Sequence, residues 1–477
     1  MRASIAFVLD GAIREIDFDP SSGLTPTTTV LQYLRHLPDH KGVKEGCAEG
    51  DCGACTVVLA EPASGGLQYH AVDSCLLFLP MIHGKQLITV ENLRGPDGDL
   101  HPVQQALVAT HGSQCGYCTP GIVMSLFALS KRRFPPTEAE IPDALVGNLC
   151  RCTGYAPILR AASEISRDQG NDHFEANEHK ALRLLRSISR ESISITTPHQ
   201  RYDQPATLRE ALRLLDKFPK ATIINGSSDV ALRVTKGHEV LPHVLDCSRI
   251  HELREVSRQS DNVVIGAGLP LTEVATFVRE EFPVLGGMLE VFAAHQIRNV
   301  ATLGGNLGTA SPVGDTLPVL MALDAEIVLR STKGTRRVRA DAFVTGYRKT
   351  VRKKNELITR VVLPRPAAGS HLRAYKISKR RDLDIATVSA GFRVRLGRGG
   401  TVDDIVLAYG GMAERTKRAS HTEKFLKGKS WERNVVEEAG RTLPSDFTPI
   451  SDVRGTAEMR QVAARNLLLK FWYDTTR

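Results

Sequence analysis

Residues 46–55 read Gly46-Cys47-Ala48-Glu49-Gly50-Asp51-Cys52-Gly53-Ala54-Cys55, and this stretch decides the fold of the first part of the chain. The spacing C-x4-C-x2-C, completed by the distant Cys75, is one at which four thiolates hold two irons and two sulfides. Glycines between the cysteines let backbone N–H groups turn toward the sulfur atoms. The sequence therefore predicts a [2Fe–2S] cluster bound by Cys47, Cys52, Cys55 and Cys75.

A second set of four cysteines follows at a different spacing. Cys115 and Cys118 form a C-x2-C pair, and Cys150 and Cys152 form a C-x-C pair after a long gap. Zinc is the main alternative metal for both sets, but zinc sites usually combine two close C-x2-C units, and each set here has one. We therefore predict a second [2Fe–2S] cluster. The ninth cysteine, Cys247, belongs to neither set and is expected to be a buried, small apolar residue.

Composition limits the classes of function. The chain has 477 residues, enough for roughly three domains, and 42% of them are hydrophobic, so a large core is expected. The net charge of +9 comes from 62 basic and 53 acidic residues, which indicates a basic face for an acidic partner or an anionic cofactor. Nucleic-acid binding is disfavoured because no basic run is interleaved with aromatic residues, which make up 5% of the chain.

The N-terminal segment carries charged residues too early for a signal peptide, and no apolar run approaches the roughly 18 residues of a membrane span. We therefore expect a cytoplasmic protein that does not bind a membrane. In that reducing compartment, clustered cysteines favour metal ligation over disulfides.

Periodicity divides the chain into predicted regions. Residues 1–92 are expected to be β-rich, because the apolar runs 5–9 and 13–18 flank the hairpin signal Asp10-Gly11. Residues 93–165 have helical patterns at 103–110, 122–132 and 155–166, and the polar residues 166–198 are predicted to be a linker containing a short helix. Strand-like and helical runs alternate in 199–370, and a further region, 371–477, ends in a helix.

Two glycine-containing loops are candidates for binding a diphosphate cofactor. The longer, residues 296–315, reads QIRNVATLGGNLGTASPVGD, and its glycines permit close approach of backbone N–H groups to phosphate. The shorter, residues 225–229, follows a predicted strand and precedes a predicted helix. A Rossmann domain is not expected, because Gly266-Ala267-Gly268 lacks the third glycine of G-x-G-x-x-G.

These motifs resemble those of the molybdenum hydroxylases. Residues 46–55 are similar to the family's ferredoxin-like cluster loop, and residues 114–121 and 147–155 to its helical-bundle cluster loops. The resemblance continues through 292–315, 346–350, 375–385, 409–413 and 451–455, so it covers nearly the whole chain, with 166–200 matching least.

The resemblance implies a multidomain α+β protein. Its parts would be a β-grasp ferredoxin-like domain, a helical-bundle [2Fe–2S] domain, a vanillyl-alcohol-oxidase-type (PCMH) FAD domain and a C-terminal α+β domain like the CO dehydrogenase flavoprotein. It also implies a set of FAD-binding residues: Asn225, Gly226, Ser227, Ser228, Asp229, Phe292, Thr302, Gly304, Gly305, Asn306, Thr309, Asp315, Ile358, Lys376 and Asp384. Leu383 departs from family members that carry an acidic residue there, and Tyr347 would lie near a nicotinamide.

The resemblance further implies the partner and the direction of electron flow. The family's molybdenum-binding domain has no counterpart in these 477 residues, so we expect a molybdopterin-binding large subunit, in a heterotetramer of two small and two large chains. Electrons would pass from the partner's molybdenum to the Cys115 set, with Gln114 beside the pterin, then to the Cys47 set, FAD and NAD⁺. The implied reaction is hydroxylation of hypoxanthine and xanthine, with aldehyde or N-heterocycle oxidation and a zinc-binding scaffold as alternatives.

Overall fold

The computed structural model describes residues 3–132, 136–167 and 172–476. The chain forms two compact units, which we describe separately. Unit 1 comprises Met1–Ala211, Lys220–Ile250 and Ala294–Ala301; unit 2 comprises Leu212–Pro219, His251–Ala293 and Thr302–Arg477. Part of the predicted 166–198 linker, residues 168–171, lies outside the described residues.

Unit 1 begins with a five-stranded sheet of order β2-β1-β5-β3-β4. Its strands are β1 (Ser4–Leu9), β2 (Ala12–Asp17), β3 (Thr56–Ala63), β4 (Gly66–Asp73) and β5 (Gln86–Ile88), and α1 (Val30–His36) follows the β1–β2 hairpin. The hairpin turns at Asp10 and Gly11, which both have positive φ (55° and 69°), as the Asp-Gly signal predicts. A capping box between Thr29 and Gln32 starts α1. The ferredoxin-like fold predicted for the N-terminal region is confirmed.

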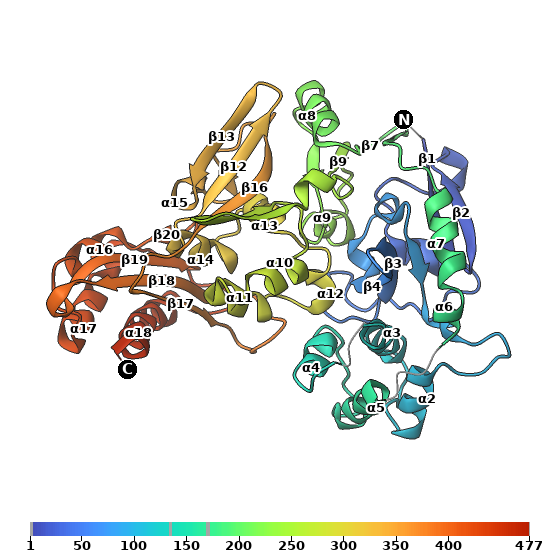
Figure 1. Cartoon of the computed structure of the whole chain (residues 1–477), viewed down its shortest axis with the longest axis horizontal. Coiled ribbons are helices and arrows are strands. Elements are labelled where there is room, and N and C mark those ends of the chain that lie inside the picture. Colours follow the sequence, from blue (N-terminus) through green and yellow to red (C-terminus); the bar gives the residue numbers. More distant parts are fainter. Residues whose placement is uncertain (1–2, 133–135, 168–171, 477) are drawn as a thin grey trace. The chain divides into compact units, whose positions relative to one another are not determined.

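A group of helices packs on this sheet (Figure 1). They are α2 (Pro102–Ala109), α3 (Thr119–Ser130), α4 (Glu140–Leu145) and α5 (Ala156–Arg167). Helix α3 is buried on all sides, and its Ile122 and Phe127 share a core with Val58 and Ile88 of the sheet. A fully buried helix needs apolar residues around its whole circumference, which explains why its sequence is almost entirely apolar.

The region predicted as a linker contains two helices, α6 (His173–Ala176) and α7 (Glu178–Ser187). Leu185 of α7 packs with Val8 of β1. Asp172, just before α6, has a nearly buried side chain that contacts two residues of the helical region: its carboxylate lies 2.7 Å from His101 Nε2 and 2.6 Å from Lys131 Nζ. Burial alone would raise the pKa of Asp172, but these hydrogen bonds hold that pKa well below its usual range. The linker is therefore anchored to the helices it follows.

Replacing Asp172 with asparagine is expected to destabilise the protein by about 2 kcal/mol near pH 7, because charge-assisted hydrogen bonds are lost while Lys131 keeps Glu175 as a second partner. A lowered folded pKa contributes stability above the unfolded pKa of about 3.9 and loses it as the pH falls through the folded value. In urea unfolding, the difference in free energy of unfolding between variant and wild type should therefore be largest above about pH 5. It should become progressively smaller below about pH 4. A gap that widens in acid would contradict the role of this carboxylate.

A second sheet of unit 1 has the order β6-β7-β9-β8, with β7, β9 and β8 parallel. The strands are β6 (Ile193–Thr196), β7 (Arg201–Gln204), β8 (Thr222–Ile224) and β9 (His243–Asp246), with α9 (Ala231–Thr235) after β8. Tyr202 and Val244 belong to the same hydrophobic core as Phe7 and Leu76 of the ferredoxin-like region. The short helix α12 (His295–Arg298) also lies in this unit.

Unit 2 contains an antiparallel sheet of order β10-β11-β16-β12-β13. Its strands are β10 (Val256–Arg258), β11 (Asn262–Gly266), β12 (Glu326–Ser331), β13 (Gly334–Arg339) and β16 (Leu357–Pro364). Helix α8 (Leu208–Lys217) belongs partly to each unit, because the boundary between the units falls after Ala211. The other elements of this region are α10 (Leu271–Val278), α11 (Pro283–Glu290), α13 (Leu303–Thr309), α14 (Thr316–Ala322), α15 (Ala340–Phe343), β14 (Val344–Gly346) and β15 (Lys349–Thr350). The antiparallel pairing agrees with the missing Rossmann signature.

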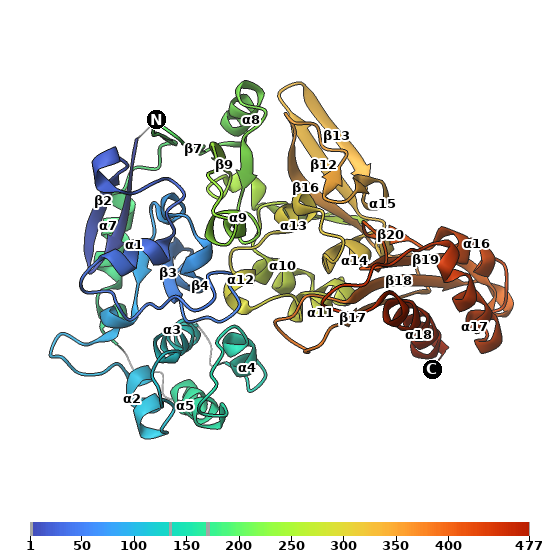
Figure 2. The same cartoon turned by 180° about the vertical axis from the view of Figure 1, so that it is seen from behind.

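The C-terminal part of unit 2 is a sheet of order β17-β18-β19-β20 covered by helices (Figures 1 and 2). The strands are β17 (Ser370–Ile377), β18 (Val388–Leu396), β19 (Val402–Gly410) and β20 (Lys417–Arg418), and the helices are α16 (Ser420–Leu426), α17 (Arg433–Thr442) and α18 (Ala457–Thr476). Phe392, Tyr409 and Phe471 form the centre of its core. Within the described residues, every helix is too short or too polar to cross a membrane.

Candidate iron–sulfur and flavin sites

Three cysteines of the first set lie in the loop that enters β3, and Cys75 lies in a 3-10 turn just after β4. The loop curls because Ala48, Gly50 and Gly53 all have positive φ (56°, 79° and 66°). Its backbone N–H groups point at sulfur: Cys47 Sγ accepts from Glu49 N at 3.4 Å and from Asp51 N at 3.3 Å. These donors favour a thiolate, as a metal ligand must be.

The thiols of this set associate in pairs. A hydrogen bond from Cys52 is the main cause that lowers the pKa of Cys47 to about 5, and the same contact raises the pKa of Cys52. Cys55 is likewise hydrogen-bonded to Cys75, and both are buried. In the described part of the chain, no three His, Cys, Asp or Glu side chains group around one position as ligands of a single ion would. The two pairs fit a [2Fe–2S] cluster, in which each iron takes two thiolates.

The second set shows the same pairing. Cys118 is the residue before α3 and hydrogen-bonds with Cys150, while Cys115 hydrogen-bonds with Cys152. Burial, followed by the Cys150 contact, raises the pKa of Cys118 to about 12. Cys115 and Cys152 are exposed, whereas Cys55 and Cys75 of the first set are buried. The second set thus presents one edge to solvent.

Two other residues beside the cysteines, Asp73 and Asn148, were not predicted from the sequence to belong to these sites. Asp73 is buried beside the first set, and Cys55 Sγ lies 3.7 Å from its Oδ1. Burial, followed by the charge of Cys47, raises the pKa of Asp73 to about 8. Asn148 is buried two residues before Cys150 and hydrogen-bonds to the first cluster loop. Their only sequence signal is a position two residues before a ligand. Cys247 is buried, as expected.

The Asn225–Asp229 loop lies in unit 1, between β8 and α9. Ser227 is buried at positive φ (54°), and its hydroxyl hydrogen-bonds to the carbonyl of Leu76. Asn225 Nδ2 donates to the carbonyl of Cys247 at 3.3 Å. A Cβ on Gly226 would lie 1.8 Å from the carbonyl oxygen of Val300, so only glycine fits there. The loop is a tightly fixed turn that offers an anion chiefly its backbone.

The other predicted flavin residues lie in unit 2. Thr302 caps α13 by accepting from Gly305 N at 3.0 Å, and Asn306 Oδ1 accepts from Thr316 Oγ1 at 2.6 Å. Ile358 of β16 faces this helix, since a Cβ on Gly308 would lie 3.8 Å from its Cδ1. Arg298, at the start of the 296–315 stretch, lies in unit 1, where it pairs with Asp143.

Lys376 and Asp315 form a buried ion pair. Lys376 Nζ lies 2.8 Å from Asp315 Oδ2, and it donates to the carbonyl of Val291, next to Phe292, at 2.7 Å. Asp315 Oδ1 is buried without a hydrogen-bond partner. Burial raises the pKa of Asp315, although Lys376 opposes the shift. Asp384 lies in the loop after β17, where it accepts from the backbone N–H groups of Arg380 and Ile385. An unpartnered buried oxygen leaves room for a donor from a bound group.

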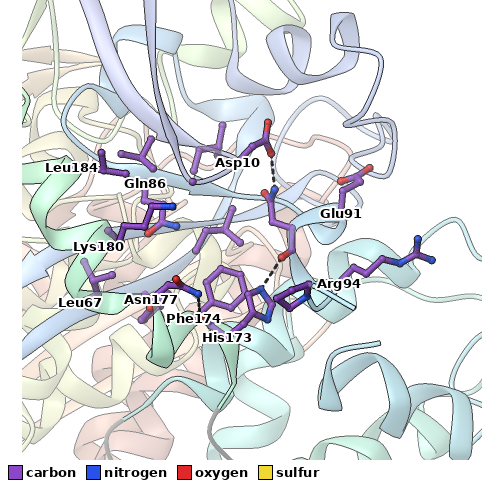
Figure 3. Close-up of a pocket in the computed structure, with 18 residues that line it drawn as sticks. Asp10, Leu67, Gln86, Glu91, Arg94, His173, Phe174, Asn177, Lys180 and Leu184 are labelled. Carbon is purple, nitrogen blue, oxygen red and sulfur yellow. Dashed lines mark hydrogen bonds between the residues drawn. The ribbon is translucent and has the colours of Figure 1, made fainter. Parts of the chain in front are cut away.

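Unit 1 also contains a cavity of about 370 Å³ beside α7 (Figure 3). Asp10, Asn92 and His173 form a hydrogen-bonded chain in its wall: Asn92 donates to Asp10 at 2.7 Å, and His173 Nε2 lies 3.1 Å from the carbonyl of Asn92. Of the described residues that line the cavity, none belongs to either cysteine set or to the predicted flavin residues.

Comparison with known proteins identifies the domains. Residues 89–163 match the [2Fe-2S] binding domain, residues 197–366 the FAD binding domain in molybdopterin dehydrogenase, and residues 373–475 the CO dehydrogenase flavoprotein C-terminal domain. The chain is 32% identical to xanthine dehydrogenase/oxidase of Gallus gallus, over 98% of this chain and 40% of that protein. It is 31% identical to xanthine dehydrogenase of Oryza sativa subsp. japonica, over 94% of this chain and 38% of that protein. The chain thus spans about two fifths of these relatives.

Solved structures resemble more than half of the chain. A chain of carbon monoxide dehydrogenase from Hydrogenophaga pseudoflava, which lacks the Mo-pyranopterin moiety, covers 58% of this chain with a TM-score of 0.54 and 27% identity, over 96% of its own length. A chain of quinoline 2-oxidoreductase from Pseudomonas putida 86 covers 59% with a TM-score of 0.53 and 26% identity, over 98% of its length. The FAD domain and C-terminal domain predicted from the sequence are thereby confirmed.

The matched domains define an iron–sulfur flavoprotein. The chain belongs to the molybdenum hydroxylase family, as one of its iron–sulfur and FAD-binding modules for electron transfer.

Proposed function

We propose that this chain is the electron-transfer subunit of xanthine dehydrogenase, working with a molybdopterin-binding large subunit. The observation that carries the proposal is similarity over nearly the whole chain to xanthine dehydrogenases, at 32% identity to the Gallus gallus protein. Neighbours named carbon monoxide dehydrogenase and quinoline 2-oxidoreductase support a second candidate, in which the same module serves another molybdenum hydroxylase. The substrate pocket would lie on the partner in both cases.

Four cysteines are assigned to each of the two clusters. We assign one [2Fe–2S] cluster to Cys47, Cys52, Cys55 and Cys75 and the other to Cys115, Cys118, Cys150 and Cys152, because each set is arranged in two thiol pairs. The exposed edge at Cys115 and Cys152 supports the second set as the one that faces the partner. Iron–sulfur clusters transfer single electrons, and FAD, which can accept two and deliver a hydride, suits NAD⁺ as the final acceptor.

The FAD residues named above are assigned to the flavin on the family's pattern, with the Asn225–Asp229 and Thr302–Thr309 loops at the diphosphate. The assembly we propose is two small and two large chains in the cytoplasm. Co-purification with the large subunit, followed by assay on xanthine with NAD⁺, tests the proposal. The purified complex should be brown and reduce NAD⁺; oxidation of an aldehyde or quinoline but not xanthine would favour the second candidate. Colourless protein with stoichiometric zinc would refute both.

Asn306→Ala is expected to weaken FAD retention by about tenfold, equivalent to about 1.4 kcal/mol. The side chain orders the Thr302–Thr309 segment through its 2.6 Å bond to Thr316, and its loss frees the loop we assign to the diphosphate. Flavin content after gel filtration, measured by absorbance, gives the result. Thr316→Val removes the same bond but keeps Asn306, so it should weaken FAD retention by a similar factor. Full flavin content in Asn306→Ala would show that the loop is only a turn.

A further inference from the structure

The two cysteine loops are directly hydrogen-bonded to each other within unit 1. Leu149 N donates to the carbonyl oxygen of Cys52 at 3.0 Å. Asn148 Nδ2 donates to the carbonyl oxygen of Gly53 at 3.1 Å and lies 3.1 Å from Thr56 Oγ1. Cys52 is a member of the first set, and Leu149 immediately precedes Cys150 of the second. One hydrogen bond therefore joins the backbone of a ligand in one set to the residue next to a ligand in the other.

Asn148 holds this junction from the inside of the protein. Its side chain is 2% exposed, and its Oδ1 accepts from Ser125 Oγ at 2.6 Å and from Gln296 Nε2 at 2.8 Å. Ser125 lies on α3, the helix that Cys118 precedes. Because both the donor and the acceptor groups of the amide are used, Asn148 has one orientation available. It fixes the second cluster loop against the first.

The backbones at the junction are in close contact. A Cβ on Gly121 would lie 2.1 Å from the carbonyl oxygen of Gly53, and a Cβ on Gly53 would lie 2.3 Å from the carbonyl oxygen of Gly147. Gly53 lies in the C-x2-C loop of the first set, Gly147 lies shortly before Cys150 of the second set, and Gly121 lies in α3, which follows Cys118. Side chains are thus excluded from the space between the loops, which keeps the separation of the two sets small.

We propose that Asn148 is a positioning residue for electron exchange between the two cysteine sets, and that the Cys52 C=O···H–N Leu149 hydrogen bond is the route. The route runs through the backbone of Cys52, across one hydrogen bond, and along Leu149 to Cys150. With clusters bound, the cluster held by the second set would give up one electron and the cluster held by the first set would accept it; no bond would break and no proton would be transferred. The proposal rests on the proposed function, because it requires both sets to bind clusters.

Asn148→Asp tests this in the purified complex with its large subunit. Aspartate is nearly the same shape and keeps the acceptor for Ser125 and Gln296, but its ionised carboxylate has no donor for Gly53 and Thr56. We expect both clusters to remain, the magnetic interaction between the two reduced clusters in EPR spectra to change, and flavin reduction after rapid photoreduction to slow by about tenfold or more, since shifts of about 1 Å alter rates on this scale. Ser125→Ala, which leaves both Asn148 donors in place, should keep the rate within about twofold.

The outcomes separate this proposal from the proposed function. Complexes in which the unmodified protein lacks iron or one EPR signal would refute the proposed function itself. Full iron with an unchanged rate and an unchanged magnetic interaction in Asn148→Asp would overturn only the positioning role. If Asn148→Asp loses iron, Thr56→Val provides the second test, because it removes one of the two acceptors of the Asn148 amide and keeps the other. It should slow transfer by a smaller factor, and an unchanged rate there would likewise overturn the role.

Discussion

Cys118→Ser is expected to remove one of two iron–sulfur EPR signals and about half of the iron. A structural metal site is lost when a ligand is replaced, since its binding free energy depends on the complete set. Cys118 has its thiol in contact with Cys150, so the substitution breaks one of the two pairs in the second set. Iron analysis and EPR of the reduced protein give the result. Retention of two intact signals would show that Cys118 is not a ligand.

The matched control is Cys247→Ala. Cys247 also carries a thiol, but it is fully buried beside Asp246 and lies far from both sets in the sequence. Its replacement should leave iron content and both signals unchanged, at a cost of about 1 kcal/mol in stability. A loss of iron in this variant would show that the signals report folding instead of ligation.

Lys376→Met is expected to destabilise unit 2 by about 3–5 kcal/mol near pH 7, because it leaves a buried carboxylate without its counter-charge. Lys376 and Asp315 are 5% and 8% exposed and lie 2.8 Å apart. Urea unfolding at several pH values measures the effect. Burial already raises the pKa of Asp315, and removal of Lys376 raises it further. A carboxyl with a raised folded pKa opposes folding as the pH rises above its unfolded value of about 3.9, so the variant should recover stability toward acid.

The double variant Lys376→Met/Asp315→Asn separates stability from flavin binding. With both charges removed, most of the lost free energy of unfolding should return, as replacement of a whole buried pair often costs little. If the pair also contacts the flavin, as we propose, FAD affinity should stay low in this stable variant. Normal FAD affinity in the double variant would identify the pair as purely structural. A double variant no more stable than Lys376→Met would contradict the ion-pair explanation.

The local elements could be predicted well from the sequence. The Asp10-Gly11 hairpin, α2, α3 and α5 all occur close to the predicted ranges, because periodicity and turn residues act over a few neighbours. The apolar pattern that begins at Leu271 continues past Val278, where helix α10 ends, and Pro283 starts a new helix, α11. The apolar pattern is shared by both helices, so periodicity alone could not divide them.

The pairing of side chains could not be predicted from the sequence, because it depends on contacts between distant segments. The spacing named eight cysteines but could not say that Cys47 pairs with Cys52 or Cys115 with Cys152. Arg298 stands in the glycine-containing 296–315 stretch, and only the fold shows that it pairs with Asp143. Asn148 was visible only as part of a motif, and its buried amide joins segments 95 residues apart in sequence.

The sequence by itself determined the chemistry of this protein: eight thiols in two sets, glycine-rich loops and the family they indicate. Those signals are local, since ligand spacing and backbone freedom are properties of short segments. Only the tertiary structure decided that the two sets meet through Cys52 and Leu149, and that Lys376 is committed to Asp315. Such contacts form because packing brings far segments together, and burial then obliges each polar group to find a partner there.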